Sequence, residues 1–329
     1  MRLSERSRRV LNAVRGRGGI GVPALAKHLE MRPATVRYEL QKLQDLEILA
    51  DNVALINVRA LGFFVYNLYL AVQYATQEDK RRFYAAISSH QAVTWFSEVG
   101  GNYQLCILVQ VRTTHGVKEL LSYLEQIKGT SIGDKLASRC LSFSVIPFDS
   151  CRLDEIAHAN TPESTGLRLS DLDPTTRSIL KFYCAPNPLS NREIAKYLGS
   201  SPASVDRRVR RLRELNIIVG YFWRLHYRES QLSKYKLLVS VRDHSSQFCH
   251  ELLRFCAERE GTSHFKECLG SWDYEVSVEV FTPGEAADFS SAFQSRFGVK
   301  LSRVDCIPVL GFGAFRPVSP EFLDFLECE

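Results

Sequence analysis

The chain has 329 residues, of which 45% are apolar and 24% charged, and its net charge is +5. This composition is typical of an ordinary globular protein, and the length predicts at least two domains. No stretch of about eighteen apolar residues and no signal-peptide core occurs, which predicts a cytoplasmic protein with no membrane partner. The nine cysteines include no Cys-x-x-Cys pair, which argues against a disulfide framework or a zinc site. We therefore expect no metal and no cofactor.

Residues 1–58 are expected to form a winged helix-turn-helix domain. Apolar periodicity predicts helices over residues 4–14, 22–29 and 32–43, and Pro33 suits the first helical position of the third. The outward face of this third helix would contact DNA, with Arg37 on its flank. The expected DNA-binding residues are Ala34, Thr35, Arg37, Tyr38, Gln41 and Lys42.

Residues 59–149 are expected to form a ferredoxin-like regulatory domain. Strands are predicted over 64–72, 93–99, 103–111 and 139–146, and helices over 78–89 and 115–127. The order is β-α-β-β-α-β, which defines the ferredoxin-like motif. Residues 150–171 are expected to be a linker, because residues 160–166 read Asn-Thr-Pro-Glu-Ser-Thr-Gly.

Residues 172–228 contain the most informative motif, a second winged helix-turn-helix. A helix is predicted over 174–184, and a capping box from Ser190 to Glu193 begins the next helix, which ends at Gly199. Ser201 and Pro202 then begin a basic helix whose apolar positions share one face. A charge run of this kind is often only a solvated face, but the helix-turn-helix context favours DNA recognition. The expected DNA-binding residues are Ser204, Arg207, Arg208, Arg210 and Arg211.

The rest of the second half repeats the β-rich pattern. Residues 216–225 are predicted to form a β-hairpin or wing. Residues 229–316 are expected to form a second ferredoxin-like domain, and residues 317–329 a C-terminal tail with one short helix. The predicted strands cover 235–242, 262–269, 272–281 and 302–312, and the predicted helices 246–258 and 283–297.

The two halves match at a constant offset of 169 residues without a gap. Leu25-Ala26-Lys27 corresponds to Ile194-Ala195-Lys196, and Phe143 corresponds to Phe312. We interpret this as a tandem duplication in an α+β chain. Positive charge is segregated: residues 1–50 carry +5 and residues 168–228 carry +7, so the remainder carries −7. Such segregation is typical of a nucleic-acid-binding protein.

This succession of elements resembles the Lrp/AsnC (feast/famine) family of prokaryotic transcription regulators. The resemblance rests on residues 172–180, on the Ser-Pro-Ala-Ser-Val-Asp-Arg-Arg-Val recognition sequence at 201–209, and on Ile-Ile-Val-Gly-Tyr at 217–221. It implies a sequence-specific regulator, not an enzyme, that binds double-stranded DNA and forms homo-oligomers. Members of this family carry one copy per chain, whereas this chain carries two.

The resemblance also implies a small-molecule effector such as an amino acid. The family's turn before the central strand reads Gly-x-Tyr/Trp-Asp, and the second half retains it at residues 270–273. The expected effector-binding residues are therefore Gly270, Trp272 and Asp273. The first half reads Gly101-Asn102-Tyr103-Gln104 and lacks the carboxylate. The alternative for Asp273 is an ordinary exposed charge at the end of a strand.

An enzyme is the alternative reading, because siroheme decarboxylases share this two-part fold and fused pairs of their subunits have about this length. A basic wing and a histidine beside the tetrapyrrole would suit that polycarboxylate substrate. The wings at 50–54 and 219–222 lack the expected arginine pair, and His226 and Arg228 stand out of register with that pattern. A protein-interaction role without DNA is a third reading, which leaves the charge segregation unexplained.

The duplication makes two further predictions. The two β-rich domains are expected to associate through sheet faces that carry Phe63, Val65, Leu68, Leu237 and Val239. The two recognition helices are expected to read different half-sites, because their outward faces differ. Tyr38, Gln41 and Lys42 in the first correspond to Arg207, Arg210 and Arg211 in the second. One copy that has lost DNA binding and serves as a scaffold is the alternative.

Overall fold

The computed structural model describes residues 3–149, 151–160 and 167–328. The chain begins with three helices, α1 (Glu5–Arg15), α2 (Val22–His28) and α3 (Pro33–Asp45). Their apolar faces meet in one cluster that contains Val10, Leu25 and Val36. We call these three helices the first helical unit.

A second helical unit consists of α6 (Pro174–Tyr183), α7 (Asn191–Tyr197) and α8 (Pro202–Glu214). The predicted capping box is present, because the amide of Glu193 donates to Ser190 Oγ at 3.3 Å and the amide of Ser190 donates to Glu193 Oε2 at 2.8 Å. Ser201 caps α8 by accepting from the amide of Ser204 at 3.2 Å. These caps satisfy orphan amides and so fix where each helix begins.

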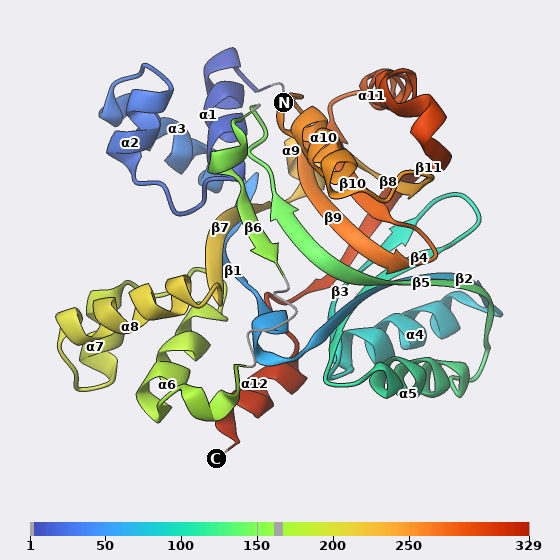
Figure 1. Ribbon diagram of the computed structural model, residues 1–329, viewed down its shortest axis with the longest axis horizontal. Coiled ribbons are helices and arrows are strands. Elements are labelled where there is room, and N and C mark those ends of the chain that lie inside the picture. Colours follow the sequence, from blue (N-terminus) through green and yellow to red (C-terminus); the bar gives the residue numbers. More distant parts are fainter. Residues whose placement is uncertain (1–2, 150, 161–166, 329) are drawn as a thin grey trace.

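The remaining elements follow the same order in both halves of the chain (Figure 1). In the first half they are β1 (Leu49–Ile56), β2 (Phe64–Tyr74), α4 (Gln77–Ser89), β3 (Val93–Val99), β4 (Leu105–Val111), α5 (Thr114–Glu125) and β5 (Thr130–Val145). In the second half they are β7 (Ile218–Leu225), β8 (Ser233–Val241), α10 (Ser246–Ala257), β9 (Thr262–Gly270), β10 (Tyr274–Val280), α11 (Pro283–Phe297) and β11 (Leu301–Phe315).

The larger sheet closes on itself. Its strands run in the order β2-β4-β3-β11-β8-β10-β9-β5, and β5 also pairs with β2. The circuit therefore contains four strands from each half, joined at the antiparallel pairs β3–β11 and β5–β9. Closure of this kind leaves no exposed edge, and an eight-stranded barrel has room inside for side chains or one small ligand.

Helices cover the outside of the barrel on two sides (Figure 1). α4 and α5 lie against the strands of the first half, and α10 and α11 against those of the second. Leu68 packs under the first pair, and Leu237 and Val239 under the second. These residues therefore do not join the two halves, as the sequence had suggested. The halves meet through paired strand edges and through interior residues such as Tyr69 and Leu238.

The strand that follows each helical unit does not fold into a hairpin. β1 and β7 instead pair with each other as a separate antiparallel two-stranded sheet. In this sheet Val53 lies opposite Phe222, and these two residues are themselves 169 positions apart. A local two-fold relation between the halves therefore passes through this pair. The predicted wing hairpin over 216–225 is wrong, because the edge of each strand is satisfied by its counterpart.

Two other segments differ from the expectations. β5 begins nine residues before the predicted start at Arg139, because its first part pairs with β2 and its last part with β9. Residues 157–160 of the expected linker form β6 (Ala157–Asn160), which pairs with the end of β5. Residues 161–166 of that linker lie outside the described residues.

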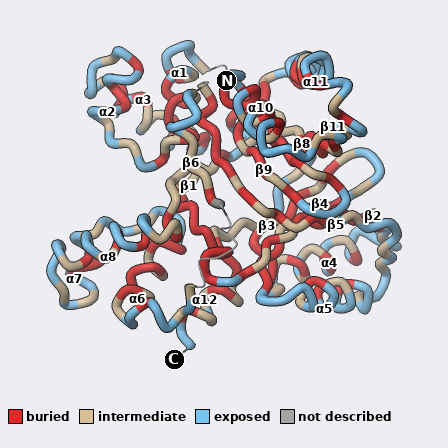
Figure 2. Tube along the Cα trace, viewed as in Figure 1, coloured by how far each residue is buried: buried red, intermediate tan, exposed pale blue. Residues whose placement is uncertain are grey.

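Each helical unit packs against the opposite half of the barrel. Arg8 and Arg15 of α1 reach Phe281 and Glu279 of the second half. The second helical unit shares its core with Phe63 of the first half and with the C-terminal helix α12 (Pro320–Glu327). Figure 2 shows that the outer faces of α7 and α8 are exposed while the strands between the two units are buried.

Candidate functional site

A cavity of about 930 Å³ lies where the β1–β7 sheet faces the end of the barrel. Both halves of the chain contribute to its wall, through β1, β3 and β5 from the first and through β7, β8, β9 and β11 from the second. The mouth of a β-barrel is a common place for a small-molecule site, and this volume suits a large ligand. Aromatic rings line much of the wall: Trp95, Phe143, Phe148, Phe222, Trp223, Tyr227, Phe312 and Phe315.

The wall of this cavity is strongly basic. Its lysines and arginines are Arg15, Arg59, Arg224, Arg228, Lys234, Lys236, Lys266 and Arg316. Its only carboxylates among the described residues are Glu47 and Glu229. His226 and His264 also line it. Such a wall favours an anionic ligand, and the aromatic rings favour one with flat apolar surface.

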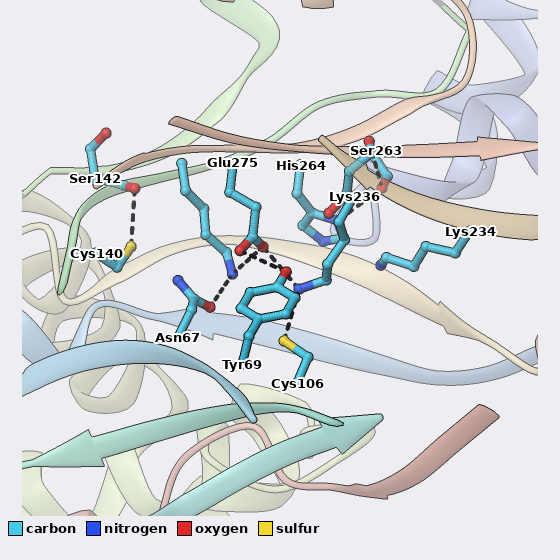
Figure 3. A network of polar contacts seen from close by, with 12 residues as sticks. Asn67, Tyr69, Cys106, Cys140, Ser142, Lys234, Lys236, Ser263, His264 and Glu275 are labelled. Carbon is cyan, nitrogen blue, oxygen red and sulfur yellow. Dashed lines mark hydrogen bonds and ion pairs between the residues drawn. The ribbon is translucent and has the colours of Figure 1, made fainter. Parts of the chain in front are cut away.

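Glu275 organises the first of two buried ion-pair groups behind this wall. Its Oε1 lies 2.9 Å from Nζ of Lys236 and 2.9 Å from Nζ of Lys266, and Lys266 also donates to Asn67 Oδ1 at 2.8 Å. Figure 3 shows the Glu275 carboxylate between Lys236 and the side chains of Asn67 and Tyr69. Burial alone raises the pKa of Glu275, but the two ammonium groups outweigh this effect and lower the pKa to about 2. Glu275 is therefore ionised at neutral pH.

Glu279 organises the second ion-pair group. Its carboxylate contacts Arg15, lies 3.1 Å from Nζ of Lys234, and accepts from the hydroxyl of Tyr227 at 2.7 Å. Burial opposes ionisation, but Arg15 and Lys234 hold the pKa of Glu279 far below its usual range. Arg15 belongs to α1, so this group also fastens the first helical unit to the barrel.

His264 lies between the two groups on β9. Its ring stacks on Phe143 and its Nδ1 lies 2.9 Å from Oγ of Ser263. Burial, followed by the positive charge of Lys234, holds the pKa of His264 well below its ordinary value. The imidazole is therefore neutral at pH 7 and can accept a hydrogen bond or ligate a metal carried by a ligand.

The DNA-binding residues expected on α8 lie on its exposed side. Arg207 and Arg210 are exposed and pair with no carboxylate in the part of the chain that the structure describes. Arg211 lies 3.4 Å from Glu214, while Arg208 turns back to donate to Ser204 at 2.6 Å and lies 3.5 Å from Asp173. Ser204 and Arg208 are thus partly used within the protein.

The DNA-binding residues expected on α3 are placed similarly but are less basic. Ala34, Arg37, Tyr38 and Gln41 are exposed, and Thr35 and Lys42 are half-buried. Tyr38 is 66% exposed, which is unusual for a large aromatic side chain without a partner. Neither this set nor that on α8 borders the cavity.

The three residues expected to bind an effector are occupied by structural contacts. Trp272 is buried against Tyr69 inside the barrel, and Asp273 Oδ2 accepts from the amide of Val241 at 2.8 Å. Gly270 has φ of +145°. None of the three lines the cavity. An effector site at these residues stays a prediction.

Sequence reasoning missed most of the cavity residues. His226 and Arg228, noted only as out of register, line the cavity near its exposed side. Lys234, Lys236, His264 and Lys266 were not singled out. The available signal was their position within strands, where charged residues alternate with apolar ones in Lys-Tyr-Lys-Leu and His-Phe-Lys.

The fold and the cavity together define a helix-turn-helix protein with a closed barrel that encloses a basic, aromatic-lined site. A family model described as winged helix-turn-helix DNA-binding matches residues 172–219. No curated protein sequence matches the chain. In the described part of the chain, no helix is long and apolar enough to cross a bilayer, and no three His, Cys, Asp or Glu side chains form a metal cluster.

Among solved structures, the chain is similar to the siroheme decarboxylase NirDL. The identity is 13%, the match covers 98% of this chain and 97% of that chain, and the TM-score is 0.58. NirDL in complex with an iron-uroporphyrin III analogue matches with 13% identity over 98% of both chains, at a TM-score of 0.55. An AsnC family transcriptional regulator from Agrobacterium tumefaciens matches 42% of this chain and 90% of its own, with 17% identity and a TM-score of 0.36.

The whole-chain similarity corrects one expectation. The prediction that the chain is not an enzyme is wrong, because the fold that extends over its whole length is that of a decarboxylase. The resemblance to Lrp/AsnC regulators holds for a winged helix-turn-helix unit and for neighbours that cover about 43% of the chain.

Proposed function

We propose that this protein is an enzyme of the siroheme decarboxylase type, which acts on a polycarboxylated tetrapyrrole bound in the central cavity. One observation carries the proposal: the cavity of about 930 Å³ is lined by basic and aromatic side chains. A tetrapyrrole presents a flat aromatic ring with carboxylates at its rim, so it needs both kinds of contact.

The net reaction replaces a side-chain carboxylate of the substrate by a proton and releases carbon dioxide. The carbon–carbon bond to the carboxylate breaks, and the electron pair left on carbon takes up a proton. The roles of this chain's residues are to hold the remaining carboxylates with Lys234, Lys236 and Lys266 and to stack the ring against Phe143 and its aromatic neighbours. The neutral imidazole of His264 lies at the same wall.

The test is to incubate the purified protein with siroheme and to follow the tetrapyrrole by absorbance and mass spectrometry. We expect stoichiometric binding and a product that has lost carbon dioxide. A substrate that is neither bound nor changed in mass would overturn the proposal. A matched variant is Lys266→Gln, in which the wall loses one cation while Lys236 still neutralises Glu275.

We also propose that the helical units bind double-stranded DNA and that the chain arose by tandem duplication of one unit-plus-barrel-half. The family model over 172–219 and the exposed arginines of α8 support DNA binding. The uninterrupted offset of 169 residues supports duplication. A regulatory ligand, an amino acid or the tetrapyrrole itself, and assembly into homo-oligomers belong to this second candidate.

Its test compares two double variants in DNA-binding measurements at several salt concentrations. Arg207→Ala with Arg210→Ala removes the unpaired arginines, and Arg81→Ala with Lys118→Ala removes the same charge from exposed positions on α4 and α5. Each lost phosphate contact flattens the slope of log affinity against log salt by about 0.9. Equal slopes for both double variants would contradict binding through α8.

A further inference from the structure

The positive charge behind the cavity wall is in excess. One carboxylate, Glu275, serves both Lys236 and Lys266, and another, Glu279, serves both Lys234 and Arg15. Each group therefore carries one more positive than negative charge. The side chains of the four cations are between 4% and 11% exposed, so water does little to stabilise this excess.

The excess lies on one side of the molecule, although the backbone is nearly two-fold symmetric about the Val53–Phe222 pair. The residues 169 positions away from the two groups are uncharged. Asn67 corresponds to Lys236, Ser97 to Lys266, Val65 to Lys234, Cys184 to Arg15, Cys106 to Glu275 and Gln110 to Glu279.

Two buried arginines at the same wall have donors to spare. Nε and Nη1 of Arg15 and Nε of Arg59 are buried and reach no acceptor among the described residues. Both arginines line the cavity. Unpaired guanidinium donors beside an uncompensated positive charge indicate that acceptors of negative charge belong in the cavity.

We propose that the cavity binds one polyanionic ring per chain in a single orientation. The carboxylate-rich edge of the ring lies against Lys234, Lys236 and Lys266, and its less charged edge faces the first half of the chain. The nature of the ring rests on the proposed function, whereas the orientation rests on the charge asymmetry of this chain.

The experiment titrates wild-type protein and three single variants with iron uroporphyrin III and measures stoichiometry and Kd from the absorbance of the ring. Lys236→Gln and Lys266→Gln are each expected to weaken binding by about tenfold to a hundredfold, the loss of one charge-assisted contact. Lys118→Gln on α5 removes the same charge from an exposed site outside the cavity and is expected to leave Kd unchanged. Equal Kd values for all three variants would overturn the assignment.

Glu275→Gln distinguishes a binding role from a merely structural one. If the lysines bind the ring, removal of their shared carboxylate frees both and tightens binding, by about threefold or more. If the lysines only neutralise Glu275, this variant weakens binding or leaves it unchanged, which contradicts the proposal. Circular dichroism and the thermal unfolding profile confirm that each variant is folded before it is titrated.

Stoichiometry and the induced circular dichroism of the bound ring test the single orientation. One ring per chain with one strong dichroic band supports it, and two rings per chain overturn it. If the wild type binds no tetrapyrrole, the proposed function fails. The anion site is then tested separately with benzenehexacarboxylate, which is expected to raise the unfolding temperature of the wild type but not of Lys236→Gln. An equal or absent rise in both overturns the site as well.

Discussion

The imidazole of His264 lies almost parallel to the ring of Phe143, with 5.3 Å between the ring centroids and 12° between the planes. The ring of Phe222 meets the same imidazole edge-on, at 6.1 Å between centroids. The three rings come from β9, β5 and β7, so this contact joins both halves of the barrel to the two-stranded sheet. It places an uncharged base in the wall of a basic cavity.

This environment predicts an acid-sensitive stability. The pKa of His264 is depressed in the folded protein, so below pH of about 6.5 the unfolded chain binds the additional proton and folding stability falls. The slope from this residue is at most about 1.4 kcal/mol per pH unit. We expect His264→Gln to reduce the slope between about pH 5 and 7.5, measured by urea unfolding, since that range lies above the usual titration of carboxylates.

The control is His115→Gln, because the side chain of His115 is 67% exposed. This variant is expected to keep the wild-type slope. The contribution of Glu275 appears in a separate window: its folded pKa of about 2 is depressed, so its stabilisation is lost only as the pH falls below about 4.3. Identical slopes for wild type and His264→Gln would contradict a neutral His264.

The ion-pair group around Glu279 predicts a large effect of one substitution. Glu279→Gln leaves Arg15 and Lys234 buried without a carboxylate, and we expect a loss of about 3–5 kcal/mol in the free energy of unfolding. Glu98→Gln breaks the pair with Lys80, whose side chains are 37% and 30% exposed, and should cost less than about 1 kcal/mol. Denaturant unfolding measures both. Similar losses would show that the buried group is not specially stabilising.

The C-terminal helix is predicted to hold the second helical unit on the barrel. Phe322 is fully buried, with its ring centroid 5.1 Å from that of Phe63. Phe322→Ala opens a cavity between α12, α6 and β2 and is expected to cost about 3–5 kcal/mol. Glu327→Gln removes only the surface pair with Lys181 and should cost less than about 1 kcal/mol. Urea unfolding of the full chain is the measurement, and a loss under about 1 kcal/mol for Phe322→Ala would refute the role of α12.

Two glycines at corresponding positions provide a matched comparison. Gly270 has φ of +145°, and a Cβ there would lie 2.5 Å from the carbonyl oxygen of Ala137. Gly101 has φ of +84° and open space around it. We expect Gly101→Ala to cost about 1 kcal/mol, from backbone conformation alone. Gly270→Ala is expected to cost about 3 kcal/mol, because a steric clash is added.

Unfolding measurements on the two alanine variants decide this comparison. A smaller loss for Gly270→Ala than for Gly101→Ala would mean that the turn relaxes freely. In that case the close approach of β9 to β5 could not be the reason for glycine at residue 270, and its expected effector role would gain weight.

Local signals in the sequence were sufficient for the helical units. Ser190 with Glu193, Ser201 with Pro202, and the spacing of Val205, Val209 and Leu212 fix the helix starts and the buried face of α8. Caps and apolar periodicity act between residues three or four apart, so they can be read without the tertiary structure. The order of strands and helices in each half follows from similar short-range patterns.

The sequence alone also determined that Lys234, Lys236, Glu275 and Glu279 alternate with apolar residues along two strands. Alternation places the charged and apolar side chains on opposite faces of a sheet, but it does not say which face meets water. Only closure of the barrel decided this, because it turned the charged face inward and brought Glu275 to Lys236 across 39 residues of sequence. The site therefore depends on contacts between distant strands, which no local pattern can specify.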